Sequence, residues 1–138
     1  RLGGDTQPRL RSLASVHHLE TRLEGRLRPG VDLLEVIERL HPTPALGGSP
    51  RAAAARWLAE SEPLDRGWYG APFGWLTPDG GGRAQVGIRS ALVRPEAAVL
   101  FAGAGIVSGS DPAHEWRETG LKLQPVRAAL HLEGRRGR

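Results

Sequence analysis

The spacing of apolar residues predicts two helices in the first half of the chain. Apolar side chains recur every three or four positions over residues 31–40, which is typical of a short amphipathic helix. The sequence His41-Pro42-Thr43-Pro44 ends this helix, because proline lacks the amide donor that a helix needs. Ser49 is predicted to cap a second, alanine-rich helix that runs from Pro50 to about Ser61.

Strand patterns dominate the second half of the chain. A glycine- and aromatic-rich strand is predicted over residues 67–76, whereas the one strand predicted before the two helices lies around residues 16–19. Residues 77–82, Thr-Pro-Asp-Gly-Gly-Gly, predict a hairpin turn. Residues 83–93 alternate between apolar and polar side chains, and residues 97–102 are continuously apolar, as in a strand buried on both faces.

A last helix is predicted from Ser110-Asp111-Pro112 to about Leu130. Trp116, Leu123 and Leu130 recur every seven residues, so we expect them to pack into the core. The order is one strand, two helices, three antiparallel strands and one helix, which predicts an α+β fold with antiparallel sheets. The domain is expected over residues 12–130, between an irregular N-terminal segment (1–11) and a basic tail (131–138).

Length and composition favour one globular domain. The chain has 138 residues, of which 39% are hydrophobic and 25% charged, and this balance argues against wholesale disorder. No stretch approaches the roughly 18 consecutive apolar residues of a membrane span, and residues 1–11 do not resemble a signal peptide. The chain contains no cysteine, which excludes disulfides and agrees with a cytoplasmic location. It also contains no methionine, so we expect it to be part of a longer protein.

The net charge of +4 is compatible with anionic partners. The basic residues are nearly all arginine and are spread along the chain; the one dense run is Arg135, Arg136 and Arg138. No aromatic-rich basic strand or recognition helix accompanies them, so neither nucleic acid nor a membrane is expected as a partner. The sequence gives no indication of the oligomeric state.

Three charged residues of the last helix form the first candidate site. Glu115, Glu118 and Lys122 are three and four residues apart, so they share one helix face. Two carboxylates on one face can bind a hard cation such as magnesium, if the substrate or further carboxylates complete the site. The alternative is a solvated face with a Glu–Lys pair, which stabilises a helix by a few tenths of a kcal/mol.

Two further features could bind an anion. Gly103-Ala104-Gly105 could bring backbone amides close to a ligand, although glycines in a strand can also mark only a bend. Arg89 interrupts an otherwise apolar strand, and its guanidinium suits two-point contact with a carboxylate. A solvent-exposed edge position would explain Arg89 equally well.

Two histidines and one tyrosine complete the candidate site residues. His17 and His18 are adjacent in a predicted strand, so only one of them can face a site. Tyr69 is the only tyrosine, and its hydroxyl could bind a substrate. A structural role remains open for both types of residue. No Ser-His-Asp set, zinc spacing or dinucleotide-binding fingerprint is present.

Seven short motifs follow one another along the chain. They are His17-His18-Leu19-Glu20-Thr21, Leu40-His41-Pro42-Thr43-Pro44-Ala45-Leu46-Gly47-Gly48, Asp65-Arg66-Gly67-Trp68-Tyr69, Gly74-Trp75, Ile88-Arg89, Phe101-Ala102-Gly103-Ala104-Gly105-Ile106-Val107 and Glu115-Trp116-Arg117-Glu118-Thr119-Gly120-Leu121-Lys122-Leu123. Their order and spacing resemble the chorismate-binding enzymes, and the resemblance covers about residues 12–130. This family includes isochorismate synthases, salicylate synthases and the large components of anthranilate and aminodeoxychorismate synthases.

The resemblance implies a magnesium-dependent site for chorismate. It places magnesium on Glu115, with Glu118 supporting the ion directly or through water. Arg89 would grip a carboxylate of chorismate, and Lys122 would lie near a substrate carboxylate. The remaining implied contacts are a catalytic histidine near the substrate ring, His18, and further carboxylate-binding positions, Tyr69, Gly103, Ala104 and Gly105.

The resemblance to one group of enzymes within the family rests on Ala45. Anthranilate and salicylate synthases usually have a hydroxyl residue at this position, whereas His-Pro-Thr-Pro-Ala looks like isochorismate synthases. The implied reaction is that of an isomerase, which adds water at C2 of chorismate and expels the hydroxyl at C4. Such enzymes serve menaquinone or siderophore synthesis. The alternatives are another chorismate-utilising enzyme or a non-catalytic basic fragment that binds nucleic acid.

The chain departs from the family pattern in one important respect. The family's general base, general acid and a further metal-binding glutamate precede the histidine motif by many residues, so they would lie before Arg1. The only lysine present is Lys122, which belongs to a different motif. The resemblance therefore predicts a C-terminal part of the fold, an incomplete α-β-β-α sandwich, that is inactive alone.

Overall fold

A two-stranded antiparallel ribbon begins the protein. The computed structural model describes residues 2–12 and 17–131, and it contains both helices and strands, in agreement with an α+β fold. In the ribbon β1 pairs with β4 and β2 pairs with β3. The four strands are β1 (Leu2–Gly4), β2 (Arg9–Ser12), β3 (His17–Glu20) and β4 (Leu23–Gly25).

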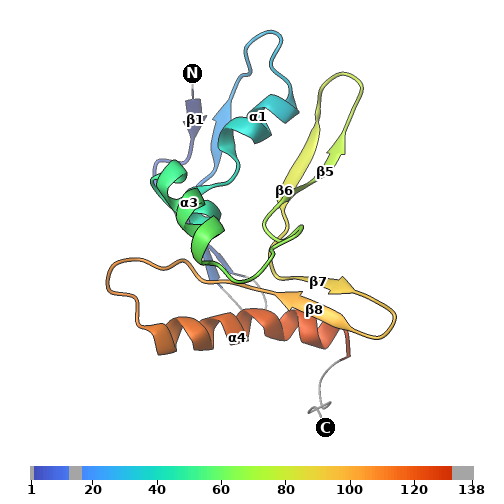
Figure 1. Cartoon of the computed structure of the whole chain (residues 1–138). Coiled ribbons are helices and arrows are strands. Elements are labelled where there is room, and N and C mark those ends of the chain that lie inside the picture. The colour runs from blue at the N-terminus through green and yellow to red at the C-terminus, as the bar shows by residue number, and fades with distance from the viewer. Residues whose placement is uncertain (1, 13–16, 132–138) are drawn as a thin grey trace.

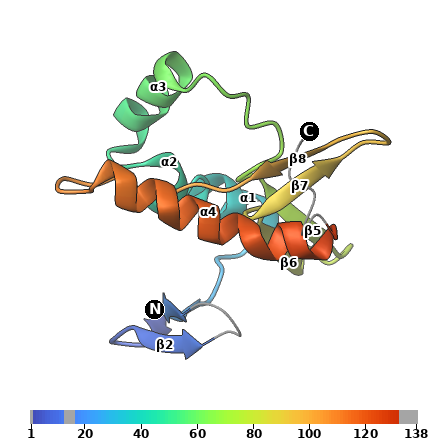
Figure 2. The same ribbon diagram turned by 90° about the horizontal axis from the view of Figure 1, so that it is seen from below.

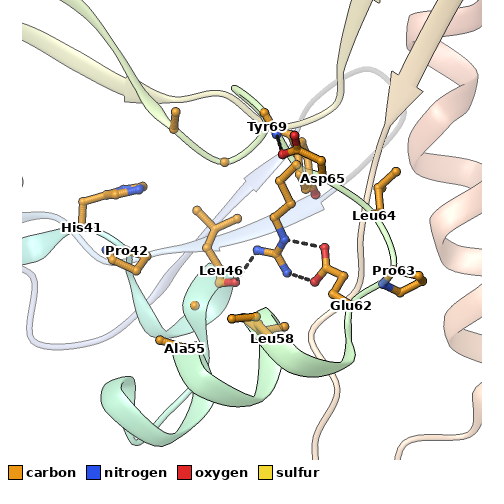
Figure 3. A pocket seen from close by; sticks show the side chains of 16 residues that line it. His41, Pro42, Leu46, Ala55, Leu58, Glu62, Pro63, Leu64, Asp65 and Tyr69 are labelled. Carbon is orange, nitrogen blue, oxygen red and sulfur yellow. Dashed lines mark hydrogen bonds and ion pairs between the residues drawn. The ribbon is translucent and has the colours of Figure 1, made fainter.

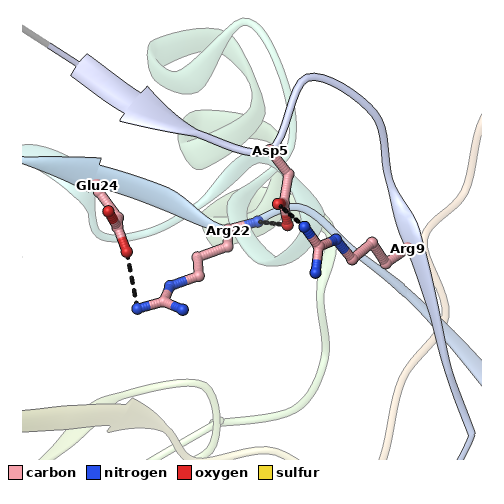
Figure 4. A network of polar contacts seen from close by, with 4 residues as sticks. All are labelled: Asp5, Arg9, Arg22 and Glu24. Atoms are coloured by element: carbon pink, nitrogen blue, oxygen red, sulfur yellow. Dashed lines mark hydrogen bonds and ion pairs between the residues drawn. The ribbon is translucent and has the colours of Figure 1, made fainter.

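Asp5 joins the two halves of this ribbon where its strands are interrupted (Figure 4). Its carboxylate accepts hydrogen bonds from the Arg9 guanidinium at 2.6 Å and from the Arg22 backbone amide at 3.3 Å. Arg22 in turn forms an ion pair of 2.7 Å with Glu24. The structure thus has regular strands in the segment for which the sequence predicts an irregular conformation. Strands of three or four residues are too short to produce a recognisable alternation of apolar and polar residues.

Three helices follow the ribbon: α1 (Leu33–Leu40), α2 (Pro44–Gly47) and α3 (Arg51–Ser61). The predicted first helix is confirmed, and it begins two residues later because the Asp32 carboxylate caps it by accepting from the Glu35 amide at 3.0 Å. The predicted cap on the second helix is wrong. Pro50 occupies the cap position of α3 and no side chain caps it.

The hairpin predicted by the Thr-Pro-Asp-Gly sequence is confirmed. Strands β5 (Pro72–Leu76) and β6 (Gly82–Val86) pair antiparallel around it. Gly80 has a φ of 82° in the turn, a conformation that favours glycine. The strand predicted over residues 67–76 is half wrong. Residues 67–70 form a turn instead, in which the Tyr69 amide donates to the Arg66 carbonyl at 2.8 Å.

A second hairpin consists of β7 (Ser90–Val93) and β8 (Ala98–Phe101). The single strand predicted over residues 83–93 is therefore wrong, because the chain bends between β6 and β7 at residues 87–89. Apolar alternation continues through the bend and hides it. Arg89 has a φ of 50°, which lies outside the strand region of backbone space.

The last helix, α4 (Pro112–Ala129), confirms the prediction at both ends. The Asp111 carboxylate accepts from the His114 amide at 2.7 Å and caps the first turn. The helix runs along the β7–β8 hairpin, as both views of the molecule show (Figures 1 and 2). None of the helices in the described ranges has the length and apolar character that a bilayer crossing requires.

The described residues contain no fully buried apolar core. Trp116 is 78% exposed, so its predicted core position is wrong, and Leu34 and Leu40 of the α1 stripe are 56% and 65% exposed. Val99 in β8 is 43% exposed, which contradicts a strand buried on both faces. The apolar pattern is that of buried elements, but the contacts of α1 with β6 and of α4 with β8 leave these side chains largely exposed.

Candidate functional site

Lys122 connects α4 to the glycine-rich segment after β8. Its ammonium donates a hydrogen bond to the carbonyl oxygen of Gly103 at 3.0 Å. It also forms an ion pair of 2.7 Å with Glu118, one turn earlier in the helix. Because both partners lie on fixed backbone elements, the position of the Lys122 charge is determined by the fold.

The same lysine acts on the acidity of Glu118. The hydrogen bond and the charge of Lys122 lower the pKa of the Glu118 carboxyl, and the charges of His114 and Arg89 add smaller effects in the same direction. Glu118 is therefore a carboxylate at neutral pH.

Tyr69 also lies beside Gly103. Its ring stacks on Phe101 of β8, with ring centroids 5.7 Å apart and an interplanar angle of 17°. A methyl group built on Gly103 would lie 3.0 Å from the Tyr69 hydroxyl oxygen. A side chain at position 103 would therefore crowd the hydroxyl, and glycine keeps the space beside it open.

Arg89 reaches this region from the bend between β6 and β7. Its φ of 50° is uncommon for a residue with a side chain, and such conformations concentrate at functional sites. Four predicted residues are thus brought together around the β8–α4 connection: Tyr69, Gly103, Glu118 and Lys122. The charge of Arg89 acts on one of them, Glu118.

Glu115 occupies the first turn of α4 and is partly buried. The amino-terminal end of a helix favours a carboxylate. Among the described residues no group of three or more histidine or acidic side chains lies close enough to hold a metal ion. Of the described residues, Glu115 and Glu118 are therefore the two predicted carboxylate ligands of a metal ion, and Glu118 is already paired with Lys122.

The remaining predicted residues are not joined to this cluster by any recorded contact. Ala45 lies in α2 and is exposed. Ala104 is partly buried and Gly105 has open space around its Cα atom. His18 lies in β3 opposite Arg11, and its side chain is outside the described part of the structure.

The structure adds a clamp that the sequence motifs did not single out. Arg66 donates to both carboxylate oxygens of Glu62, at 2.7 and 2.6 Å, and to the carbonyl oxygen of Leu46 at 3.2 Å. This clamp lies in a cleft of about 610 Å³, which Tyr69 also lines (Figure 3). It fixes the end of α3, the turn that carries Tyr69 and the α2 segment that carries Ala45.

Mutual interaction changes the acidity of both clamp residues. The hydrogen bonds and charge of Arg66 lower the pKa of Glu62, against a smaller opposing effect of burial. Glu62 likewise raises the pKa of Arg66. The four-residue spacing of Glu62 and Arg66 was a possible signal. The predicted helix ends at about Ser61, however, and such spacing indicates contact only within a helix.

A lysine–glutamate pair bound to a glycine-rich segment, with a tyrosine hydroxyl beside it, is an arrangement that could bind a small anionic molecule. Comparison with known proteins gives the family. The family model described as "Chorismate binding enzyme" matches residues 2–131, and the chain belongs to this family. The match begins ten residues earlier than the sequence resemblance predicted.

Several curated relatives of the chain and one solved structure are named isochorismate synthases. The chain is 50% identical over 127 residues to the salicylate biosynthesis isochorismate synthase of Pseudomonas aeruginosa, covering 92% of this chain and 27% of that protein. It is 48% identical over 128 residues to isochorismate synthase MenF of Bacillus subtilis, covering 93% and 27%. The chain thus spans about a quarter of the length of these curated relatives.

A crystal structure from Bacillus anthracis, assigned as the 2,3-dihydroxybenzoate-specific isochorismate synthase DhbC, has the same fold over the shared part. The two structures superpose with a TM-score of 0.91 at 36% identity. The match covers 96% of this chain and 36% of that chain. The fold of the chain is therefore that of a chorismate-binding enzyme over the shared part.

Proposed function

We propose that this chain forms part of the active site of an isochorismate synthase, the enzyme that converts chorismate to isochorismate. The observation that carries the proposal is the contact of Lys122 with both Gly103 and Glu118, at 3.0 and 2.7 Å, beside the Tyr69 hydroxyl. These residues come from α4, the segment after β8 and the turn before β5, yet they meet at one place. The names of the curated relatives support the same reaction.

The cluster provides the donors that a dicarboxylate needs. In our proposal Arg89 and Lys122 attract the substrate carboxylates, and the Tyr69 hydroxyl and the amides of residues 103–105 donate hydrogen bonds to them. We place His18 near the substrate ring. Ala45 lacks the hydroxyl that a hydroxyl-bearing residue at this position would present to the substrate. Fixed donors of this kind position an anion without reorganising during the reaction.

We propose magnesium as the metal ion. Glu115 would bind it, and Glu118 would support it directly or through water. Oxygen donors suit magnesium, which retains several waters, and the pKa of Glu118 is already lowered by Lys122. Two carboxylates do not complete a site, so further ligands would come from substrate and from the rest of the enzyme. When bound, magnesium would neutralise part of the substrate charge.

The chemical step needs groups that this chain does not offer in the cluster. Water adds at C2 of chorismate and the C4 hydroxyl leaves, so a base must accept one proton and an acid must donate one. Lys122, the only lysine, is occupied by Gly103 and Glu118. We therefore propose that the 138 residues are an incomplete α-β-β-α sandwich that binds substrate but does not catalyse alone.

An assay of product formation tests two proposals: that the enzyme makes isochorismate, and that the 138-residue chain is inactive alone. The 138-residue chain is incubated with chorismate and magnesium, alone and with the unmatched part of the Pseudomonas aeruginosa relative, and products are separated by chromatography. We expect isochorismate only from the combination. Isochorismate from the chain alone would contradict its inactivity, whereas anthranilate formed with added ammonia, or salicylate, would assign a different reaction of the family.

A further inference from the structure

Arg66 is bonded to two separate walls of the cleft in Figure 3. Its guanidinium donates to the carbonyl oxygen of Leu46 in α2 at 3.2 Å, and its own backbone carbonyl accepts from the Tyr69 amide at 2.8 Å. Leu46 and Tyr69 both line the cleft. Arg66 therefore holds the turn of residues 67–70, the Tyr69 turn, with its backbone, and it holds the segment that carries Ala45 with its side chain.

The bond to Leu46 lies at the end of α2, where the helix supplies no donor of its own. The last carbonyl groups of a helix have no amide partner within it, and a basic side chain commonly supplies the missing donor. A helix of four residues has little stability by itself, and no side chain caps the first turn of α2. The position of Ala45, the residue before Leu46, therefore depends on Arg66.

Glu62 fixes the orientation of the Arg66 guanidinium. Its two carboxylate oxygens accept from Nε and Nη2 at 2.7 and 2.6 Å, which leaves Nη1 for Leu46. Two-point contact fixes the plane of the guanidinium as well as its position. The Arg66 side chain is 33% exposed, whereas the arginines of the other ion pairs in the described residues are 63% to 77% exposed. The geometry is that of a fixed support and not of a surface ion pair.

The Tyr69 turn is also bonded to the bend that carries Arg89. The Gly70 amide donates to the Gly87 carbonyl oxygen at 2.7 Å, and the Gly87 amide donates to the Ala71 carbonyl oxygen at 2.9 Å. A methyl group built on Gly87 would lie 3.4 Å from the same Ala71 oxygen, so the two backbones pack closely. A displacement of the turn would therefore reach two of the proposed carboxylate-binding residues, Tyr69 and Arg89.

We propose that Arg66 is a positioning residue that holds the Tyr69 turn at a fixed distance from α2 in the substrate site. Its charge is paired with Glu62, so it acts through Tyr69 and Ala45 and not by contact with a substrate carboxylate. Small displacements of the groups that position a substrate weaken an enzyme strongly. The role of Arg66 toward substrate rests on the proposed function, whereas its coupling of α2 to the turn does not.

Arg66→Lys separates positioning from charge. A lysine can keep an ion pair with Glu62, but its ammonium lacks the planar fork that holds both carboxylate oxygens and the Leu46 carbonyl together. Arg51→Lys is the matched control. Arg51 also donates to a backbone carbonyl beside α2, that of His41, but no contact of Arg51 with the Tyr69 turn is recorded in the described residues.

NMR signals from both walls give a readout that needs no substrate. Tyr69 is the only tyrosine, so its ring signals are unambiguous, and the Ala45 methyl signal is assigned by its loss in Ala45→Gly. We expect Arg66→Lys to shift both signals and Arg51→Lys to leave the Tyr69 signals in place. If Arg66→Lys left both signals unshifted, or if the two variants shifted the Tyr69 signals equally, the positioning role would be overturned.

Glu62→Gln provides a second variant in which Arg66 itself is retained. The amide presents one acceptor oxygen in place of two, so the guanidinium loses its two-point contact. The Tyr69 and Ala45 signals should shift in the same direction as in Arg66→Lys, by a smaller amount. Shifts confined to Arg66→Lys would contradict the orientation of Arg66 by Glu62. Urea denaturation of each variant shows that the spectra are those of folded protein.

Titration with chorismate in the presence of magnesium relates the support to substrate. We expect the Kd of the 138-residue chain for chorismate to rise about tenfold in Arg66→Lys and to stay near the wild-type value in Arg51→Lys. A wild-type Kd in Arg66→Lys would overturn the role of Arg66 toward substrate. If the wild-type chain bound no chorismate while Arg66→Lys still shifted both signals, the proposed function would fail and the coupling of α2 to the turn would stand.

Discussion

Lys122 and Gly103 are joined by a hydrogen bond of 3.0 Å from the lysine ammonium to the glycine carbonyl oxygen. This contact fixes α4 against the segment that follows β8 and brings Glu118 beside the Tyr69–Gly103 pair. The relationship turns three separate sequence motifs into one cluster. Its consequences can be measured independently of enzyme activity.

Removing the Lys122 charge should raise the pKa of Glu118. The hydrogen bond and charge of Lys122 are the largest causes of the lowered pKa of Glu118. Lys122→Met removes both, so the carboxyl should titrate closer to its ordinary value. The measurement is a pH titration of carbon-13-labelled carboxylates by NMR.

A second charge removal on the same helix serves as the control. Arg127→Met also removes one positive charge from α4, but no contact with Glu118 is recorded for Arg127 in the described structure. The titration of Glu118 should be almost unchanged in this variant. Equal upward shifts in both variants would mean that net helix charge, and not the Lys122 contact, controls the acidity of Glu118.

The elements with strong local signals could be predicted from the sequence. Asp111 followed by a proline fixes the start of α4, and the Thr77–Gly80 turn fixes the β5–β6 hairpin. The backbone at Arg89 could not be placed, because the alternation of apolar and polar residues continues through the bend. A left-handed conformation at an arginine depends on tertiary contacts, which the sequence pattern does not display.

Burial was the property that the sequence predicted least well. Trp116 and Leu34 occupy positions typical of a core, yet they are 78% and 56% exposed. Periodicity indicates which face of an element is apolar, but not whether another element covers it. The Glu62–Arg66 clamp escaped prediction for a related reason, since its geometry depends on the turn after α3.

Gly103→Ala and Gly105→Ala form a matched pair of substitutions. A methyl group on residue 103 would lie 3.0 Å from the Tyr69 hydroxyl oxygen, whereas none of the described atoms lies within 4 Å of one on residue 105. We expect the alanine at position 103 to displace the Tyr69 ring from Phe101, at a cost of about 1 kcal/mol. Gly105→Ala should leave the ring in place.

The single tyrosine makes this comparison straightforward. Selective isotope labelling of tyrosine gives ring signals for Tyr69 alone, and ring stacking on Phe101 shifts them from their free positions. The shift should diminish in Gly103→Ala only. Unchanged Tyr69 signals in both variants would show that the backbone at residue 103 can move away from the hydroxyl.

The Glu62–Arg66 clamp should make stability depend on pH. Arg66 lowers the pKa of Glu62 in the folded chain, so the ionised carboxylate stabilises the fold above the pKa of the unfolded chain. That stabilisation is lost as the pH falls through the lowered pKa of Glu62. Glu62→Gln should reduce the free energy of unfolding by about 1 kcal/mol at neutral pH, and by less at acidic pH.

Urea denaturation at neutral and acidic pH measures the difference between wild type and Glu62→Gln. Glu60→Gln removes an exposed carboxylate from the same helix, and no ion pair of Glu60 is recorded in the described structure. This control should change stability little at either pH. If the loss caused by Glu62→Gln were the same at both pH values, ionisation of Glu62 would not be its source.

The cap of α4 should determine how firmly Glu115 is held. Asp111 accepts a hydrogen bond from the His114 amide at 2.7 Å, and Glu115 lies in the same first turn. Asp111→Ala removes the acceptor at a cost of about 1 kcal/mol, which corresponds to about fivefold faster hydrogen exchange of the first-turn amides if they exchange by local opening. Asp111→Asn retains an acceptor oxygen, so exchange should stay near the wild-type rate. Hydrogen exchange followed by NMR distinguishes these outcomes. Equal protection in wild type and Asp111→Ala would show that contacts with β8, and not the cap, hold the turn that carries Glu115.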